Sequence, residues 1–231
     1  MAMIPDMGVS MPACYAQFGK LLNVLDAVAS CRWHCDGGDH LVQYLIGRCV
    51  SNARASHSLL MIGMYDESLA LTRSIGELAN LLLLFGYDRA AFAQWRAADR
   101  KERLRLFQPR HVRDELEKRQ IPVGIDRERY AALSEIGVHA TPETKPNAHN
   151  PGRKANLGGR QQLLGAMICM NELAYSLGLA GAAAGSTLVS DPRGKAELRS
   201  ESVALIRSIG GATILNRDEL LTELEDVSVE S

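Results

Sequence analysis

The sequence predicts an all-α protein, an irregular multi-helix bundle with one long loop rich in Pro and Gly. Apolar residues recur at steps of three and four over most of the 231 residues, which is the spacing of one helix face. No segment alternates apolar and polar residues for long enough to form a strand, and no repeat of roughly 20 to 50 residues is visible. We therefore expect a single helical domain over residues 1–216, followed by an acidic tail over residues 217–231.

The first three helices are predicted over residues 13–30, 39–63 and 66–86. Pro12 suits the first turn of the first helix, where its missing amide hydrogen costs nothing. Asp39 and Asp66 can cap the second and third helices, because their carboxylates accept hydrogen bonds from the first free amides. Apolar side chains nearly surround the third helix, so we expect it at the centre of the bundle.

Three short helices with a basic excess are predicted next, over residues 88–98, 99–106 and 109–120. Between Asp88 and Arg119 the chain has ten Lys or Arg and six Asp or Glu, a net charge of +4. Charges of opposite sign alternate here at helical spacing, which favours a solvated face. The alternative is a binding surface, with its candidate residues Arg100, Arg103 and Arg105.

The rest of the chain is expected to form three more helices and the long loop. Asp126 should cap a helix over residues 126–138, and residues 141–159 should be a loop that is either mobile or functional. The most apolar helix follows over residues 160–188, and its Gly and Ala residues at 178–185 should allow a neighbouring helix to approach closely. A last helix should begin at Pro192 and stop at Gly210. The short connections favour antiparallel neighbours.

Charge and composition exclude several functional classes. The 26 basic and 27 acidic side chains nearly cancel, so any binding to nucleic acid or anionic lipid must be local. Residues 1–11 lack the basic start and apolar run of a signal peptide, and charged or polar residues interrupt every apolar stretch before about 20 residues. We therefore expect a cytoplasmic protein that does not bind a membrane. Its five cysteines are odd in number and are expected to be free thiols.

Three polar residues interrupt the apolar third helix. Arg73, Glu77 and Asn80 occupy positions i, i+4 and i+7 and should therefore share one face. A buried Arg requires a carboxylate, and Glu77 lies within reach. The plain interpretation is an internal ion pair that fixes helix register, and the functional one is a polar pocket.

A second polar group comprises Tyr130, Ser134 and His139, near the end of the helix before the long loop. The imidazole of His139 has a pKa near neutrality and could act as a base or hold a ligand. The plainer alternative is a His that interacts with the carbonyl groups at its helix C-terminus.

Neither a metal nor a cofactor is expected. Thiolate and imidazole ligands suit Zn²⁺, and one segment contains several candidates, Cys31, His34, Cys35, Asp36, Asp39 and His40. The four-residue spacing of the two cysteines is poor for zinc and no second Cys pair exists, so a helix end with free thiols is preferred. The chain also lacks a phosphate-binding Gly-rich loop and a Gly-x-Ser-x-Gly nucleophile elbow.

Three stretches resemble a group of small helical bacterial proteins: GMYDESLALTRSIGELANLLLLF, FQPRHVRDEL and YAALSEIGVHAT. These proteins share an Arg-x-x-x-Glu helix and a later Leu-Ser-x-x-x-x-His element, and they are distantly similar to HEPN-type helical bundles, which include RNase toxins and defence proteins. The resemblance covers roughly residues 56–141. It implies that Arg73, Glu77, Ser134 and His139 meet in one polar site.

The resemblance and the basic stretch together lead to two functional hypotheses. HEPN ribonucleases have an Arg and a polar neighbour ahead of the His, and here Ser134 and Glu135 stand in those places. We therefore expect a non-enzymatic module of a bacterial defence or mobile-element system, binding a protein partner or nucleic acid through residues 96–119 and the long loop. The alternative is an RNA-cleaving toxin with Arg73, Glu77 and His139 as catalytic residues. An Arg105 to His111 spacing also matches the ribonuclease pattern, but chance supplies such matches. A homodimer is a further expectation.

Overall fold

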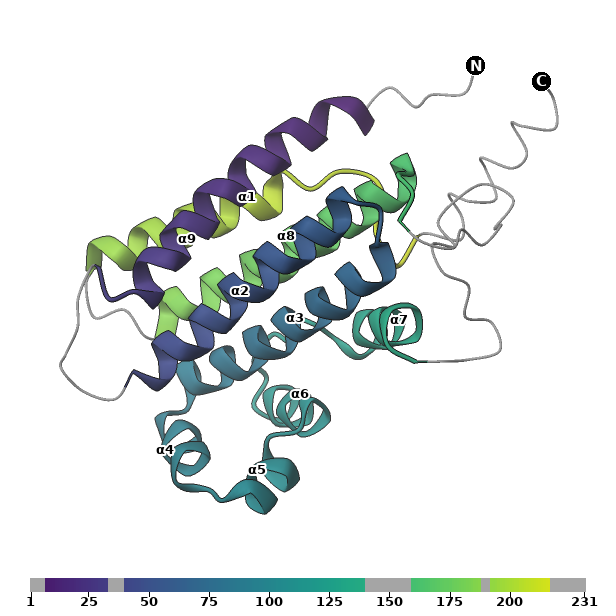
Figure 1. The fold of residues 1–231 in the computed structure, drawn as a ribbon. Helices are drawn as coiled ribbons and strands as arrows, with labels where there is room; N and C mark the ends of the chain where they lie inside the picture. Colours follow the sequence, from purple (N-terminus) through teal and green to yellow (C-terminus); the bar gives the residue numbers. More distant parts are fainter. Residues whose placement is uncertain (1–6, 33–39, 140–158, 188–191, 217–231) are drawn as a thin grey trace, which may run out of the picture.

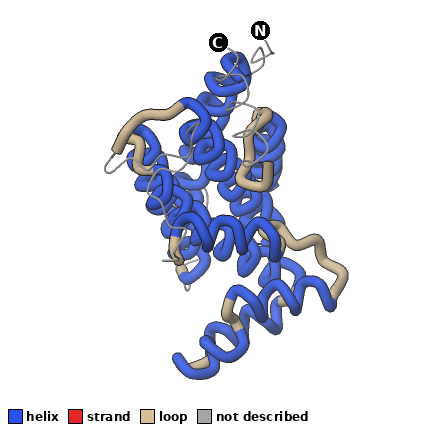
Figure 2. Tube along the Cα trace, turned by 90° about the vertical axis from the view of Figure 1, so that its right-hand side faces the viewer, coloured by secondary structure: helices blue, strands red, loops and turns tan. Residues whose placement is uncertain are grey.

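The computed structural model describes residues 7–32, 40–139, 159–187 and 192–216. These residues form helices joined by turns and short connections, with no strand among them (Figures 1 and 2). The prediction of an all-α bundle is confirmed. The helices in order are α1 (Met7–Ala29), α2 (Leu41–Met61), α3 (Tyr65–Tyr87), α4 (Arg89–Ala97), α5 (Arg100–Leu106), α6 (Pro109–Lys118), α7 (Arg127–Gly137), α8 (Leu163–Thr187) and α9 (Pro192–Arg207).

The main body is built around α3 and α8, which make the most extensive helix contact in the fold. Helices α1, α2 and α9 pack around this pair, and α7 lies against α3 (Figure 1). Ile75 and Leu82 of α3 and Leu173 and Leu177 of α8 are completely buried. Burial of one such side chain stabilises the fold by about 1.5–3 kcal/mol, so this contact is the main source of hydrophobic stabilisation. The predicted central position of the third helix is confirmed.

Helices α3 and α8 are also long and apolar enough to cross a membrane by length and composition alone. In this fold 50% of the apolar window of α3 and 78% of that of α8 are buried inside the protein. Both helices therefore use their apolar surface to build the core.

Small residues of α8 let α9 approach closely, as the sequence predicts. A Cβ atom built on Gly178 would lie 2.6 Å from Cγ1 of Ile206, and one on Gly181 would collide with the Ser202 hydroxyl. Helix α9 therefore packs against bare backbone along this part of α8.

One predicted helix start and one predicted helix cap are wrong. Helix α1 begins at Met7, so Pro12 lies inside the helix and not in its first turn. Helix α3 begins at Tyr65, one residue before Asp66, and its N-cap Met64 makes no side-chain cap hydrogen bond. Asp66 instead lies in the first turn, where a carboxylate is favourable beside the free amides.

Carboxylate caps fix the starts of three shorter helices. The side chains of Asp88, Asp99 and Asp126 accept 2.8 Å hydrogen bonds from amides in the first turns of α4, α5 and α7. The predicted Asp126 cap is confirmed. An N-cap carboxylate contributes about 1 kcal/mol, which matters for helices that bury little apolar surface.

Helices α4, α5 and α6 form a separate lobe at the end of α3 (Figures 1 and 2). The lobe has its own small core, formed by Leu84, Phe85, Ala91, Val112, Leu116 and Ile121. The ring of Phe85 lies 5.2–6.3 Å from the rings of Phe92, Trp95 and Phe107. This aromatic group attaches the lobe to the C-terminal end of α3.

Three predicted features lie outside the described residues, wholly or in part. They are the Pro- and Gly-rich loop over residues 141–159, the Asp39 cap and the acidic tail over residues 217–231. The described cysteines Cys14, Cys49 and Cys169 are free thiols and are buried. Burial raises the pKa of the Cys49 thiol to about 12, consistent with cysteines that act as small apolar residues.

Candidate functional site

A polar group, here called the Tyr130 cluster, lies between α3, α6 and α7. It comprises Arg73, Glu77, Arg113, Tyr130 and Ser134. Nη1 of Arg73 donates to the Ser134 hydroxyl at 3.1 Å, and Nη2 lies 3.3 Å from Oε1 of Glu77. The guanidinium carbons of Arg73 and Arg113 lie 5.2 and 4.1 Å from the centre of the Tyr130 ring. The structure therefore brings together four of the residues that the sequence singles out.

The Tyr130 cluster retains hydrogen-bonding capacity. Nε of Arg73 and Oε1 of Glu77 are buried and lack a hydrogen-bond partner, so the contact between these side chains is an ion pair without hydrogen-bond geometry. The Arg73 and Glu77 side chains are 20% and 23% exposed, so solvent still reaches the pair. Both interpretations of the sequence, an ordinary ion pair and the edge of a polar pocket, fit this geometry.

Arg113 is an exception among the charges of residues 88–119, most of which are expected to form a solvated face. Its side chain is only 8% exposed, and among the described residues no carboxylate pairs with it. Arg113 lies three residues before the buried Leu116, on the buried face of α6, and stacks on Tyr130. That three-residue spacing is the sequence signal that could have identified it.

His139 lies beyond the C-terminal end of α7, where its amide donates to the carbonyl oxygen of Ser134 at 2.9 Å. The residue is exposed, and the contacts that assemble the Tyr130 cluster do not include its imidazole. Two residues earlier, Gly137 packs on the backbone of Ala70 and Asp66, so α7 runs from Arg73 toward the start of α3. His139 therefore follows the part of α7 that leads away from Arg73.

Asn80 is separate from Arg73 and Glu77 although it continues their row on α3. Its side-chain oxygen accepts from the amides of Gly124 and Ile125, both at 3.1 Å, and its nitrogen donates to the Ile125 carbonyl at 2.9 Å. The residue is 4% exposed. Asn80 therefore holds the connection between α6 and α7 against α3, at the wall of a cavity of about 450 Å³ between α3 and α8.

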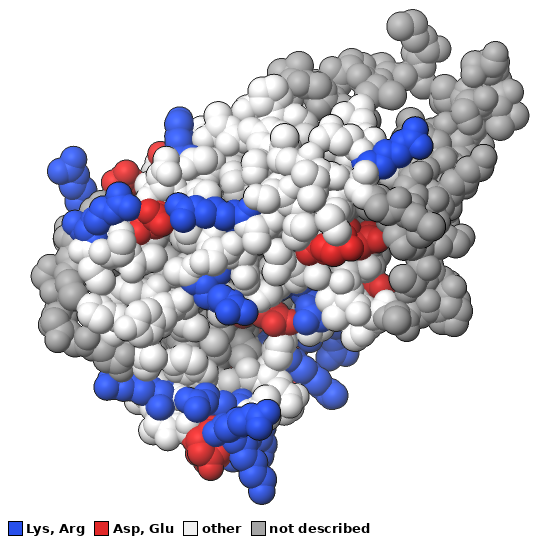
Figure 3. Space-filling model, viewed as in Figure 1, with Lys and Arg blue, Asp and Glu red and all other residues white. Residues whose placement is uncertain are grey.

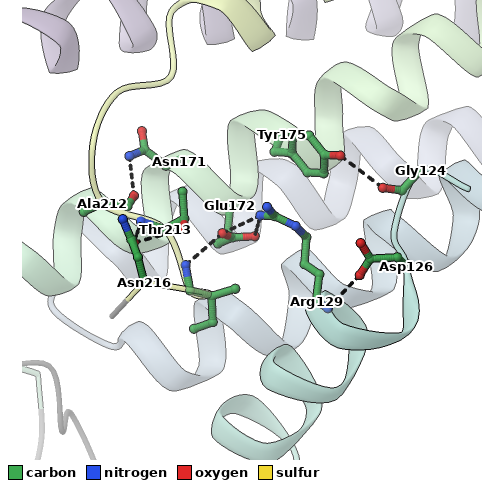
Figure 4. Close-up of polar contacts among 10 residues, drawn as sticks. Gly124, Asp126, Arg129, Asn171, Glu172, Tyr175, Ala212, Thr213 and Asn216 are labelled. Carbon is green, nitrogen blue, oxygen red and sulfur yellow. Dashed lines mark hydrogen bonds and ion pairs between the residues drawn. The ribbon is translucent and has the colours of Figure 1, made fainter. Parts of the chain in front are cut away.

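A second ion pair, more deeply buried than the first, joins α7 to α8 (Figure 4). Nη1 of Arg129 lies 2.6 Å from both carboxylate oxygens of Glu172, whose side chain is completely buried. Oε1 of Glu172 also accepts from the Ile214 amide at 3.0 Å. The guanidinium of Arg129 lies over the Tyr175 ring, and the Tyr175 hydroxyl donates to the Gly124 carbonyl. Glu172 thereby connects α8 to α7 and to the segment that follows α9.

Neighbouring polar contacts complete this connection. Asn171 donates to the carbonyl oxygen of Ala212 at 2.6 Å, and Asn216 accepts from the amide of Thr213 (Figure 4). Asn171 also donates to the Gly210 carbonyl at 2.8 Å. The described hydrogen-bond partners of Glu172 are Arg129 and the Ile214 amide, which both belong to the fold itself. We therefore assign a structural role to Glu172 and the residues that contact it. Glu172 is the only charged residue of α8, and this isolated charge is the sequence signal that could have revealed it.

Helix α5 carries the most concentrated positive charge of the lobe. Four of its seven residues are basic, Arg100, Lys101, Arg103 and Arg105, and all four are exposed. Among the described residues none of these four side chains forms an ion pair. Figure 3 shows Lys and Arg side chains gathered over the lower end of the molecule, where Figure 1 draws α4, α5 and α6. The candidate binding residues Arg100, Arg103 and Arg105 therefore share one short helix.

A cavity of about 470 Å³, here called the lobe cavity, opens between the end of α3 and helices α4, α5 and α6. Arg105 of α5 and His111 of α6 both line it. The two residues lie on different helices, as Pro109 between them predicts, and yet they face the same space.

An ion-pair network forms part of the wall of the lobe cavity. Arg119 lies 2.6 Å from the carboxylate of Asp88 and 2.7 Å from that of Glu115. Hydrogen bonds from the backbone amide of Ala91, then from Arg119 and Ala90, lower the pKa of Asp88 against the opposing effect of desolvation. The acidic side chains of this wall are therefore largely neutralised by the protein itself.

Most of the candidate zinc ligands lie outside the described residues, which include only Cys31 and His40 of that group. Sγ of Cys31 lies 3.5 Å from Nδ1 of His40. In the part of the chain that the structure describes, three or more His, Cys, Asp or Glu side chains nowhere gather as metal ligands would.

Comparisons with protein-family models, with curated proteins and with solved structures give no match. A functional assignment therefore has to come from the geometry and charge of the described residues.

Proposed function

We propose that this chain is a nucleic-acid-binding module whose contact surface is helix α5 with its four basic side chains. The observation that carries the proposal is that four exposed basic side chains on seven residues form no ion pair with any described residue. Helix α5 also buries none of its residues. Its charges are therefore not needed to hold the fold together, and they are placed where a phosphate backbone could reach them.

The pairing of other basic residues supports this choice of surface. Arg119 and Arg129 are neutralised by carboxylates within the fold, and Arg73 is paired with Glu77. On α5 the only acidic residue is Glu102, whose amide is used by the Asp99 cap. A local positive surface on a chain of net charge −1 is the arrangement that the sequence requires of any nucleic-acid binder. A role in bacterial defence or in a mobile element remains a prediction from the resemblance.

The test is a binding measurement with a matched control. A fluorescein-labelled 12-nucleotide RNA is titrated with the wild type and with the triple variant Arg100→Ala, Arg103→Ala, Arg105→Ala, and binding is followed by anisotropy. The control removes three exposed basic residues of α9 instead, Lys195→Ala, Arg199→Ala and Arg207→Ala. We expect the α5 variant to lose at least about tenfold in affinity while the control binds like the wild type. Equal losses in both variants would contradict the assignment of the surface.

An acidic protein is the other partner that a basic helix can bind. Competition distinguishes the two, because polyglutamate carries the negative charge of nucleic acid without bases or phosphates. We expect unlabelled RNA to displace the labelled RNA at far lower concentration than polyglutamate. Displacement by both at equal charge concentration would favour a protein partner instead.

A ribonuclease is the second candidate function, and the Tyr130 cluster is the observation in its favour. The Arg73 and Glu77 side chains are 20% and 23% exposed, and their accessible atoms could contact a phosphate and a hydroxyl of RNA. The predicted catalytic residues are Arg73, Glu77 and His139, with the imidazole as acid or base. Growth arrest on expression that disappears in a folded His139→Ala variant would support it. A harmless wild type that leaves RNA intact would exclude it.

A further inference from the structure

The lobe cavity has the size and the apolar floor of a small-molecule site. Its volume of about 470 Å³ lies within the roughly 300–1,000 Å³ range of ligand pockets. Leu84 and Ala91 in its wall are buried, and Phe107 is half-buried beside them. The Phe107 ring is held edge-on to Phe85 at 6.3 Å between ring centres. The wall of the cavity therefore includes an aromatic side chain that packs against the core of the lobe.

The polar rim of the lobe cavity suits a neutral group with donors and acceptors. Its three basic residues, Arg105, Lys118 and Arg119, are balanced by its three acidic residues, Asp88, Asp114 and Glu115. Most of these charges pair within the protein, at 2.6 Å for Arg119 with Asp88 and 3.7 Å for Lys118 with Glu115. Gln94 and His111 add further hydrogen-bonding groups at the same rim. An anion alone would gain little here, whereas a planar heterocycle could both stack and form hydrogen bonds.

Arg105 links the lobe cavity to the basic side chains of α5. Its side chain lines the cavity and also belongs to the four basic residues that form no ion pair with a described residue. Arg100 lies about 7.5 Å from Arg105 along the helix axis. Phosphates held along α5 would therefore position an adjacent base at the mouth of the cavity.

We propose that the lobe cavity receives one unpaired base of a nucleic-acid strand whose phosphates lie on α5. The proposal rests on the nucleic-acid-binding function proposed above and names its ligand class, a single strand. A base within a duplex would first have to leave its stack and its partner, at a cost of a few kcal/mol. Stacking on an aromatic side chain tolerates any base, so the site selects single strands and not a sequence.

Filling the cavity without changing its charge provides the test. Gln94→Trp places an indole at the rim, whereas Ala93→Trp adds the same bulk at the neighbouring exposed position of α4, outside the cavity lining. The probes are a labelled 12-nucleotide RNA, its duplex form, and a strand of the same length made of abasic sites. We expect Gln94→Trp to weaken RNA binding by about tenfold, the gain from one stacked base, and Ala93→Trp to leave it unchanged. For both variants, a urea unfolding midpoint equal to that of the wild type confirms that the protein stays folded.

The abasic strand separates the cavity from the phosphate surface. We expect it to bind the wild type about tenfold more weakly than normal RNA and to be insensitive to Gln94→Trp. If normal and abasic strands bind equally, or if the duplex binds as tightly as the single strand, the cavity proposal is overturned. Continued loss of binding in the triple Arg variant would in that case leave the proposed function intact.

Free nucleotides test the cavity independently of α5. If no oligonucleotide binds, the proposed function fails, and uridine or adenosine monophosphate is titrated at millimolar concentration by NMR. Shifts that appear in the wild type and in Ala93→Trp but not in Gln94→Trp would support the cavity as a base site. Absence of shifts in all three proteins would overturn it.

Discussion

Removal of the Arg129 guanidinium should destabilise the protein strongly, because it leaves the carboxylate of Glu172 buried and unpaired. In Arg129→Met the aliphatic stem is kept and two contacts of 2.6 Å to Glu172 are lost. Hydrogen bonds to charged groups contribute about 1.5–3 kcal/mol each, and breaking a buried pair costs about 3–5 kcal/mol. Since the Glu172 side chain is 0% exposed, we expect a loss near the middle of that range, about 4 kcal/mol.

A second substitution should return much of this loss. In Arg129→Met, Glu172→Gln the buried charge disappears, and the Gln carbonyl can still accept the hydrogen bond from the Ile214 amide, 3.0 Å long in the wild type. We expect the double variant to recover about 2 kcal/mol relative to Arg129→Met, about half of what breaking the buried pair costs.

Urea unfolding followed by far-UV circular dichroism measures both effects. With a slope of about 2.5 kcal/mol per M, the midpoint of Arg129→Met should fall by roughly 1.5 M, and that of the double variant by about half as much. A midpoint of Arg129→Met within about 0.4 M of the wild type, or a double variant less stable than the single one, would refute this reasoning about the buried pair.

Two further predictions concern packing and pH. Gly137→Ala should destabilise the fold by about 1–3 kcal/mol in the same urea assay, because the new Cβ would lie 2.7 Å from the backbone nitrogen of Ala70. Gly19→Ala is the matched control: no atom lies within 4 Å of its new Cβ, so it should stabilise the fold by about 0.5–1 kcal/mol. Burial against Phe18 lowers the pKa of His57, so protonation favours the unfolded state. Stability should therefore fall as pH drops below about 6.5, the ordinary His value, and fall less in His57→Phe. Equal pH dependence of the two proteins would contradict this assignment.

The fold was largely predictable because it depends on periodic apolar residues. Helix α3 has an apolar surface nearly all round, and this alone places it at the centre of the bundle. The start of the same helix was less predictable: Asp66 is a good capping residue, but the chain enters the helix one residue earlier. A local capping preference contributes about 1 kcal/mol, which the packing of Tyr65 and its neighbours in the core can override.

The candidate site was only partly predictable, because side chains from different helices meet through tertiary packing. The pairing of Arg73 with Glu77 follows from their i, i+4 spacing on one helix. The stacking of Arg113 on Tyr130 joins α6 to α7, and no spacing along the chain indicates it. The lobe cavity likewise arises where four helices meet, so Arg105 and His111 line the same cavity only in the folded protein.

The salt dependence of RNA binding tests most directly whether α5 contacts phosphates. Affinity of the wild type for a single-stranded 12-nucleotide RNA is measured between about 50 and 200 mM salt. Each neutralised phosphate adds about 0.7 to the slope of log affinity against log salt for single strands, so the triple α5 variant should show a slope smaller by about 2. The α9 control should keep the wild-type slope. An unchanged slope in the α5 variant, or an equal reduction in the control, would contradict a phosphate-binding role for this helix.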